Sequence, residues 1–361
     1  MEIESIINSV PLALESVQVL ASKNLGTIPS RYIRHDLVQK VDHEILVKEI
    51  PVINLSKLID SDAGFSQEEM DKLHLACQEW GFFQLVNHGV AEEVMKKMIE
   101  DVSSFFNLPF EHKKQCSQDA EGYGQALVFS EEQKLDWGDM LFLRTQPVAL
   151  RNYQVWPAQH LIPTFRETVS MYSLEMEKVR TILLGLMAKS LGVDEGNFIN
   201  MFRDGSQQSM RMNYYPPCPE ASKVLGISPH SDATGLTILL QLNQVDGLQI
   251  RHDGTWLPVK LLPGALLVNI GDIIEVIPIL SNGIYKSIEH RVIVSKEKER
   301  ISVAAFHETH ESVEIGPLPE LIINGETAKY RSVKNYDEFE KIFLSRKLDG
   351  KSLLEFLRLN N

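Results

Sequence analysis

The chain has 361 residues, of which 43% are hydrophobic and 24% are charged, the proportions of a globular protein with a sizeable core. Its formal net charge of -13 disfavours the phosphate backbone of nucleic acid as a partner. The 3 cysteines form no CxxC pair, which argues against a disulfide framework or a zinc knuckle. No apolar run reaches the roughly 18 residues of a membrane span, and the acidic start is not typical of a leader peptide. We therefore expect a cytoplasmic protein without nucleic-acid or membrane partners.

The first half of the sequence predicts helices with a few short strands between them. In chain order we expect a helical stretch near Val17–Ser22, a strand at Pro51–Leu55, a helix after Ser66, a strand at Gly81–Val86, a helix from Val94 to Phe106, a mixed and loop-rich region at 110–160 and a long helix from Thr164 to Leu191. Ser66 and Glu69 have the spacing of a capping box, which marks the start of the helix that follows them.

From Met210 the pattern changes to short strand-like runs separated by turns. These runs fall at 210–215, 236–241, 247–251, 256–260, 265–270, 284–294 and 300–307. Their spacing is typical of an antiparallel sandwich or barrel. The last 25 residues become helical again. We therefore expect one compact unit with a helical and mixed region at 1–205, a β-core at 206–315 and a helical cover at 316–361.

A candidate metal site begins at His230-Ser231-Asp232. In an extended segment, residues i and i+2 point to the same side, so the imidazole of His230 and the carboxylate of Asp232 would aim at one point. His290, in a later strand-like run, can supply a third ligand. Two histidines and one carboxylate suit iron and leave coordination positions open. Taken alone, the pair is more typical of a polar loop than of a metal site, and we interpret the other histidines as structural or solvated.

A candidate anion site lies in the last predicted strand, where Arg300 and Ser302 share one side. A guanidinium beside a hydroxyl suits a buried carboxylate. The alternative is a surface arginine that belongs to the charged run before it. Asn213 and Tyr215 also share one side of a predicted strand, although that strand reads equally well as a tyrosine-rich part of the core.

Together these residues resemble the plant 2-oxoglutarate/iron(II) dioxygenase family over most of the chain. Further matching stretches are Cys77–Val90, Asn213–Pro219, Pro229–Asp232, Gly235–Thr237, Asp246–Gln249, Asn269–Asp272, Ser281–Gly283 and Arg300–Phe306. The stretches Ile28–Arg34 and Lys347–Lys351 make the chain most similar to the senescence-related, alkaloid O-demethylase-like group.

The resemblance implies an α+β fold with a mainly β core, namely a double-stranded β-helix (jelly roll) with flanking helices. The residues that match the family pattern are the iron ligands His230, Asp232 and His290, the pair for the distal carboxylate of 2-oxoglutarate (Arg300 and Ser302), the assisting Tyr215, Asn213 near the metal-proximal end, and Phe306 beside the organic substrate. Outside this set we expect His88 to be structural, Asp272 and Asn282 to lie in turns, and His307 and His310 to lie in a solvated loop, with a position lining the pocket as the alternative.

The activity implied by the resemblance is oxidation of a small plant metabolite, such as an aromatic alkaloid or a flavonoid-like compound, by O-demethylation or hydroxylation. Fe(II), 2-oxoglutarate and O2 would be required, with ascorbate in support, and the protein would be a monomer. Two alternatives remain open: desaturation or ring closure on the same scaffold, and a small-molecule binding protein whose catalysis is impaired.

One departure from the family pattern lies just before His290. The segment Val276–Leu280 adds about three residues between a strand that we expect to end near Glu275 and the turn Ser281–Gly283. Three residues absorbed inside a sheet ladder would turn His290 away from the metal, because an odd shift reverses side-chain direction. We therefore expect a bulge or a longer loop that leaves His290 facing Asp232.

Overall fold

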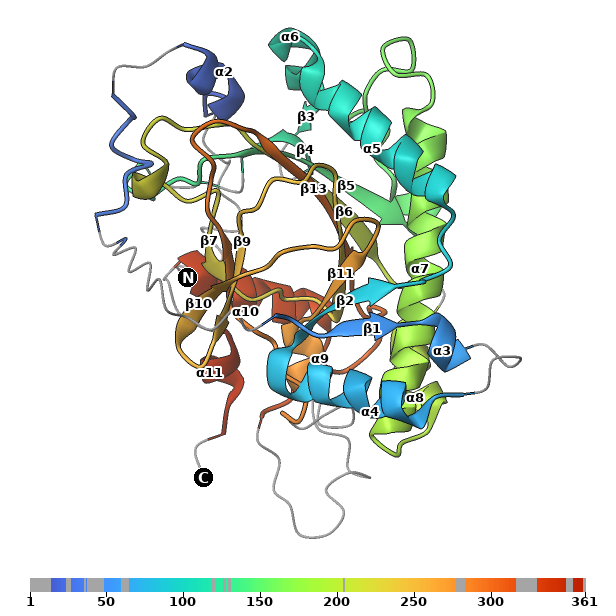
Figure 1. Ribbon diagram of the computed structural model, residues 1–361. Helices are drawn as coiled ribbons and strands as arrows, with labels where there is room; N and C mark the ends of the chain where they lie inside the picture. The colour runs from blue at the N-terminus through green and yellow to red at the C-terminus, as the bar shows by residue number, and fades with distance from the viewer. Residues whose placement is uncertain are drawn as a thin grey trace.

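The protein consists of two facing β-sheets with helices packed around them (Figure 1). The computed structural model describes residues 14–23, 27–35, 37, 49–59, 65–118, 121–125, 128, 131–203, 205–276, 283–315, 330–348 and 353–359. None of the helices formed by these residues is long and apolar enough to cross a membrane.

Within the described residues, the larger sheet has nine strands and the smaller sheet has four. The larger sheet has the order β1 (Val52–Asn54), β2 (Phe82–Val86), β11 (Leu266–Ile270), β8 (Leu236–Gln241), β13 (Arg300–His307), β6 (Gln208–Tyr215), β5 (Asp139–Gln146), β4 (Glu121–Gly124) and β3 (Ser117–Gln118). The smaller sheet has the order β10 (Thr255–Pro258), β9 (Leu248–His252), β12 (His290–Val292) and β7 (Ile227–His230). Strands β1 and β2 are parallel, and the other neighbours are antiparallel.

Helices surround the sheets, and the longest of them, α7, runs along the outer face of the larger sheet (Figure 1). The helices are α2 (Val17–Ser22), α3 (Ser56–Ile59), α4 (Gln67–Leu75), α5 (Glu92–Asn107), α6 (Phe110–Lys114), α7 (Phe165–Ser190), α8 (Glu195–Met201), α9 (Asp272–Val276), α10 (Tyr336–Leu348) and α11 (Leu353–Leu357). A π-helical turn at Ala76–Trp80 and 3-10 turns at Val148–Leu150 and Ala221–Lys223 complete these elements.

Strand β13 separates the hydrophobic core from the functional pocket. Successive side chains of a strand point to opposite sides of the sheet. The odd-numbered residues from Ile301 to Ala305 are buried in the same hydrophobic cluster as the inner face of α7. The even-numbered residues from Arg300 to Phe306 line a pocket between the two sheets. The period-two pattern of this segment therefore places its polar groups in the pocket without disturbing the core.

The α+β class predicted from the sequence is confirmed, and several elements coincide with their predicted ranges. Strands β8 and β13 occupy 236–241 and 300–307 as predicted, and α2 occupies Val17–Ser22. Ser66 caps α4 by accepting a hydrogen bond from Glu69 N at 3.2 Å. The predicted capping box is wrong in its second half, because the Glu69 carboxylate accepts from Asn54 N of β1 at 2.7 Å and so ties α4 to the sheet.

The mixed, loop-rich region 110–160 contains the eight-residue strand β5, which pairs with β6 and was not predicted individually. Two other predictions need correction. Within the predicted strand 284–294, the structure has strand only at His290–Val292. The chain near Glu275 forms α9 and not the end of a strand, because Asp272 N donates to Asp232 O at 2.7 Å and turns the backbone out of the ladder.

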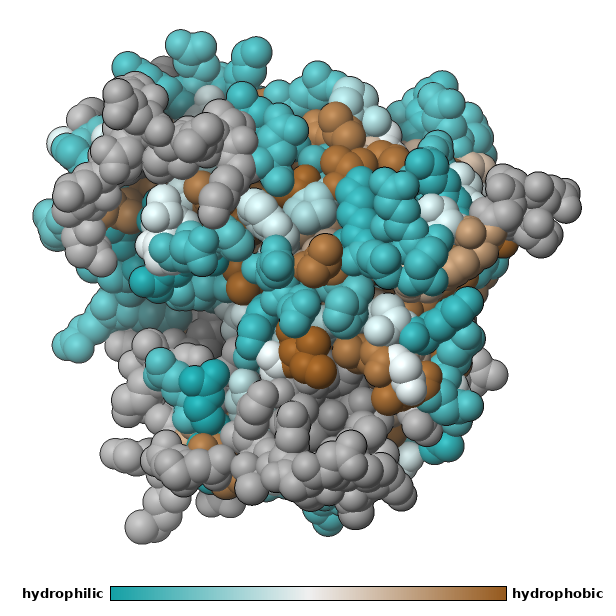
Figure 2. Space-filling model, turned by 60° about the horizontal axis from the view of Figure 1, so that its bottom comes forward, coloured by the Kyte–Doolittle hydropathy of each residue, from teal (hydrophilic) through white to brown (hydrophobic). Residues whose placement is uncertain are grey.

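On the face shown in Figure 2, hydrophilic side chains predominate among the described residues, and hydrophobic ones form small separate patches. Scattered apolar side chains are normal on a protein surface. The described residues on this face therefore form no extended apolar surface, and the pocket with the candidate functional groups lies between the two sheets.

Candidate active site

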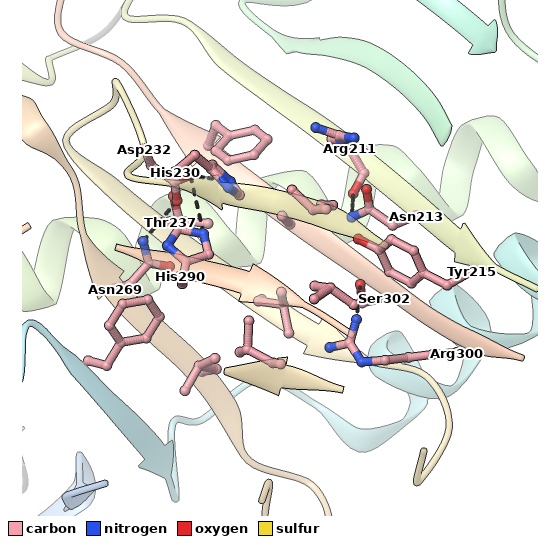
Figure 3. A pocket seen from close by; sticks show the side chains of 18 residues that line it. Arg211, Asn213, Tyr215, His230, Asp232, Thr237, Asn269, His290, Arg300 and Ser302 are labelled. Atoms are coloured by element: carbon pink, nitrogen blue, oxygen red, sulfur yellow. Dashed lines mark hydrogen bonds and ion pairs between the residues drawn. The ribbon is translucent and has the colours of Figure 1, made fainter. Parts of the chain in front are cut away.

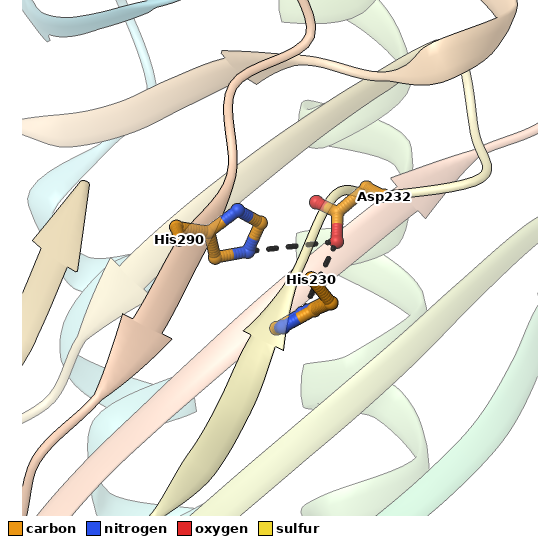
Figure 4. A group of neighbouring side chains, drawn as sticks. All are labelled: His230, Asp232 and His290. Atoms are coloured by element: carbon orange, nitrogen blue, oxygen red, sulfur yellow. Dashed lines mark ion pairs between the residues drawn. The ribbon is translucent and has the colours of Figure 1, made fainter. Parts of the chain in front are cut away.

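Two histidines of the smaller sheet stand directly opposite each other. His230 ends β7 and His290 begins β12, and the register of the two strands pairs them. Asp232 follows β7, and its Oδ1 lies 3.6 Å from Nε2 of each histidine (Figure 4). One ligand atom from each of the three residues lies within 4.8 Å of the other two. This spacing allows all three atoms to bind a single ion.

The backbone sets the orientation of both imidazoles. His230 Nδ1 lies 2.8 Å from Ser228 O, and His290 Nδ1 lies 3.2 Å from Ile288 O. A carbonyl oxygen only accepts hydrogen bonds, so each Nδ1 donates its proton to the backbone and Nε2 is the nitrogen left to bind a metal. Metal-binding histidines commonly use their second nitrogen in this way. The Phe82 ring meets the His290 ring edge-on, at a centroid distance of 5.3 Å, and supports its orientation further.

Asp232 is buried, yet it is held in its charged form. Burial raises the pKa of its carboxyl group, but His290, His230 and the hydrogen bonds from Thr237 and Asn269 outweigh that effect, so the pKa lies below its ordinary value. Thr237 Oγ1 donates to Asp232 Oδ2 at 2.6 Å, and Asn269 Nδ2 donates to the same oxygen at 2.8 Å. The carboxylate is therefore available as an anionic ligand at neutral pH.

The residues of the predicted anion site line the same pocket as the histidines (Figure 3). In the pairing of β13 with β6, Arg300 stands opposite Tyr215 and Ser302 stands opposite Asn213. Arg300 is only 1% exposed, and its guanidinium donates to Ser302 Oγ at 3.3 Å and to Gln241 Oε1 at 3.0 Å. No carboxylate among the described residues forms an ion pair with it, and its Nε has no hydrogen-bond partner.

A buried guanidinium in this state fits an anionic ligand. Burial lowers the pKa of Arg300, although arginine remains charged in proteins. An uncompensated buried charge is costly, and a bound carboxylate would remove that cost. The buried Asn213 Oδ1 also lacks a hydrogen-bond partner in the described part of the chain. Of these two unpartnered atoms, Arg300 Nε is a donor that an anionic ligand could satisfy, whereas Asn213 Oδ1 is an acceptor and would need a donor.

Glycines make room for the side chains of the anion site. A Cβ at Gly138 or at Gly226 would lie 2.8 Å from Tyr215 Cδ1, and a Cβ at Gly247 would lie 3.1 Å from Arg300 Cδ. Burial raises the pKa of Tyr215 to about 12, so its hydroxyl stays protonated and can donate to an anion. The absence of a Cβ at these two glycines therefore allows the backbone to approach the Cδ1–Cε1 edge of the ring closely.

Phe306, which the resemblance places beside the organic substrate, lines the pocket at the opposite end of β13 from Arg300. The pocket also contains Arg211, Thr237 and Asn269, to which the sequence analysis gave no role. Thr237 and Asn269 lie within matching stretches, but only the pairing of β8 with β11 reveals that they converge on Asp232. Alternation along β6 with Asn213 and Tyr215 could have indicated Arg211.

The remaining predicted residues do not line the pocket where the structure describes them. His88 bonds to Gly264 O at 3.1 Å, as a structural histidine does. His307 is fully buried and close to Gln208 Nε2 and Leu236 O, so the prediction of a solvated loop is wrong for this residue. His310 bonds to Ser312 beyond the end of β13. Asp272 is buried at the start of α9 and accepts from Ser231 Oγ, so it is more than a turn residue, whereas Asn282 lies outside the described residues.

The extra segment before His290 is only partly visible. Val276 ends α9, and residues 277–282 lie outside the described part of the chain. The backbone is described again from Gly283, and His290 stands opposite His230 with its Nε2 toward Asp232. The metal ligands are therefore brought together in spite of the additional length.

Comparisons with known proteins agree with this site. The family model of the 2OG-Fe(II) oxygenase superfamily matches residues 206–309, and that of the non-haem dioxygenase in morphine synthesis N-terminal region matches residues 50–159. The chain is 48% identical to S-norcoclaurine synthase 1 of Coptis japonica and 44% identical to codeine O-demethylase of Papaver somniferum, and each alignment covers 96% of this chain and 97% of the relative.

A solved structure extends the likeness to the fold. The crystal structure of JOX2 in complex with 2OG, Fe and JA has a TM-score of 0.86 and 37% sequence identity, and the match covers 98% of this chain and 100% of that one. The chain therefore belongs to the 2OG-Fe(II) oxygenase superfamily. It is a 2-oxoglutarate-dependent dioxygenase that uses Fe(II), and its two sheets form the expected double-stranded β-helix.

Proposed function

We propose that His230, Asp232 and His290 bind the Fe(II) of this dioxygenase. The observation that carries the proposal is the convergence of two Nε2 atoms and one carboxylate oxygen, with both Nδ1 atoms held by backbone carbonyls. Such a set leaves coordination positions open, which is the arrangement typical of non-haem iron oxygenases. When bound, the iron supplies the activation of dioxygen, and the protein supplies the geometry and a secluded pocket.

We propose further that 2-oxoglutarate lies with its distal carboxylate on Arg300 and Ser302. Tyr215 would donate to the same carboxylate, and Asn213 would lie nearer the keto-acid end. Arg300 is 1% exposed, its Nε has no hydrogen-bond partner, and no carboxylate of the described residues forms an ion pair with it, all of which support this placement. Charge-assisted hydrogen bonds from arginine to a carboxylate are among the stronger polar contacts in proteins.

The organic substrate, in this proposal, is a small plant specialised metabolite such as an aromatic alkaloid or a flavonoid-like compound, and it lies against Phe306. Dioxygen gives one oxygen atom to 2-oxoglutarate, which becomes succinate and carbon dioxide, and the other to a C–H bond of the substrate. If that carbon is an O-methyl group, the hemiacetal breaks down to an alcohol or phenol and formaldehyde. Codeine O-demethylase, 44% identical, has a name that fits this reaction.

A different reaction on the same scaffold is the main alternative. S-norcoclaurine synthase 1, the 48% identical relative, is not named for a demethylation, so desaturation, ring closure or another oxidation stays an open outcome. An impaired binding protein is the second alternative, because of the extra segment at 276–280.

One experiment separates these possibilities. The purified protein is incubated with Fe(II), ascorbate, O2, 2-oxoglutarate and a panel of O-methylated alkaloids and flavonoids, and succinate, formaldehyde and product masses are measured. Substrate-dependent succinate with equal formaldehyde supports demethylation, and succinate with a product heavier by one oxygen supports hydroxylation. Binding of a panel compound without succinate would favour the binding protein.

A further inference from the structure

We propose that Thr237 and Asn269 are positioning residues that hold Asp232 as a one-oxygen metal ligand and thereby keep a coordination position of the iron open. This inference rests on the proposed metal site. It starts from the observation that the two carboxylate oxygens of Asp232 have different neighbours. Oδ1 lies 3.6 Å from each histidine Nε2, whereas Oδ2 accepts hydrogen bonds from Thr237 at 2.6 Å and from Asn269 at 2.8 Å.

The two donors form a rigid unit. Asn269 on β11 stands directly opposite Thr237 on β8, so the two side chains are cross-strand neighbours on the same side of the larger sheet. They are 4% and 2% exposed. Both strands have a partner on each side, so neither side chain sits on a mobile sheet edge.

The backbone of Asp232 is also held. Its carbonyl oxygen accepts from Asp272 N at 2.7 Å, and a Cβ at Gly271 would lie 3.0 Å from the same oxygen. The backbone carbonyl and Oδ2 of Asp232 are therefore both held in place, and Oδ1 is the oxygen that faces the histidines. Turning the carboxylate to offer both oxygens would break two charge-assisted hydrogen bonds and bury their donors unpaired.

Denticity matters because of the number of positions that the reaction needs. Two histidines and one carboxylate oxygen leave three positions on a six-coordinate ion for the keto acid and dioxygen. A second oxygen from Asp232 would occupy one of them. The hydrogen bonds to Oδ2 thus favour an open site, in addition to stabilising the charge of the ligand.

The test is the variant Thr237→Val, which keeps the shape of the side chain and removes its donor. Thr237→Ser retains the hydroxyl and serves as the rescue. Thr234→Val is the matched control, since Thr234 is a nearby buried hydroxyl, 3.5 Å from Thr237 Oγ1, and is not bonded to Asp232. Each protein is loaded with Mn(II), and metal affinity, the relaxation of water protons by the ion, and 2-oxoglutarate affinity are measured without turnover.

We expect Thr237→Val to bind Mn(II) at least as tightly as the parent, to hold one water fewer on the ion, and to bind 2-oxoglutarate about tenfold more weakly, as the loss of a hydrogen bond of about 1.4 kcal/mol would give. Thr237→Ser and Thr234→Val should behave like the parent. An unchanged water number with unchanged 2-oxoglutarate affinity, or loss of the metal from a folded Thr237→Val protein, would overturn the inference. Asp232→Ala is measured in parallel: if it retains parental metal affinity, the proposed metal site itself is wrong.

Discussion

Gly283 N donates a hydrogen bond to Glu275 O at 3.2 Å, so the chain returns to the fold close to the point at which it left. The Glu275 side chain makes the same connection a second time, because its Oε2 accepts from Ser287 N at 2.6 Å while its Oε1 accepts from Tyr330 Oη at 2.9 Å. These bonds hold the residues on either side of the extra segment close together. The position of β12, which carries His290, therefore does not depend on the length of that segment.

Shortening the segment should therefore leave the metal site intact. Deleting Ile277–Ile279 is expected to preserve Fe(II) binding and the turnover of 2-oxoglutarate without substrate, and to change substrate preference. Iron titration and a substrate panel measure the two effects. Loss of iron from the folded deletion protein would contradict this prediction, and gain of activity by an inert parent would favour the binding-protein alternative.

The metal-ligand assignment predicts a large effect for Asp232→Ala. This change removes the single anionic ligand of the proposed site, so turnover should be abolished and Fe(II) affinity should fall sharply. Iron content after dialysis and succinate formation are the measurements. Glu297→Ala, at an exposed carboxylate, is the control and should behave like the parent. Activity close to that of the parent in the Asp232→Ala protein would remove Asp232 from the site.

Arg300→Ala should selectively weaken the binding of 2-oxoglutarate. Truncating one partner of a buried charge pair typically costs roughly 2–5 kcal/mol, and about 1.4 kcal/mol corresponds to a factor of ten. The concentration of 2-oxoglutarate for half-maximal turnover should therefore rise at least about tenfold. Arg211→Met removes the other guanidinium of the pocket and should change this requirement much less. An unchanged requirement in Arg300→Ala would show that the distal carboxylate binds elsewhere.

The buried Glu308 predicts a pH dependence of folding stability. Burial and the neighbouring Glu340 raise its pKa to about 7, and Ser209 Oγ donates to it at 3.2 Å. Below about pH 4 the group is protonated in both the folded and the unfolded chain. As the pH rises toward 7 the unfolded chain releases its proton first, so the folded state loses stability over this interval, by on the order of 3 kcal/mol.

Glu308→Gln should remove this loss, because the amide stays neutral throughout. Urea unfolding at a series of pH values between about 4 and 8 is the measurement. The free energy of unfolding of the variant should fall less than that of the parent over this range. The control Glu297→Gln, at an exposed carboxylate, should reproduce the parental pH profile. Parallel profiles for Glu308→Gln and the parent would show that Glu308 is ionised in the folded protein.

The parts of the site that lie along one strand were predictable from the sequence, whereas contacts between strands were not. Alternation alone indicated that Arg300, Ser302 and Phe306 share a side of β13. The pair of hydrogen bonds from Thr237 and Asn269 to Asp232 depends on the register of β8 with β11, which the local sequence pattern does not encode. Likewise, β5 was missed because its strand character depends on pairing with β6, which lies about 70 residues further along the chain.

The pairing of β13 with β6 places Arg300–Tyr215 at one end and Phe306–Ser209 at the other. The two pairs are six residue steps apart along the strand, which corresponds to about 20 Å. Effects of substitutions beyond roughly 7–10 Å usually add independently. Changes at Phe306 or Ser209 can therefore accumulate during evolution, or in a designed library, with little penalty in co-substrate affinity. With the proposed placement of the two ligands, new organic substrates could be recruited at one end of the pocket while the demand for 2-oxoglutarate stays constant.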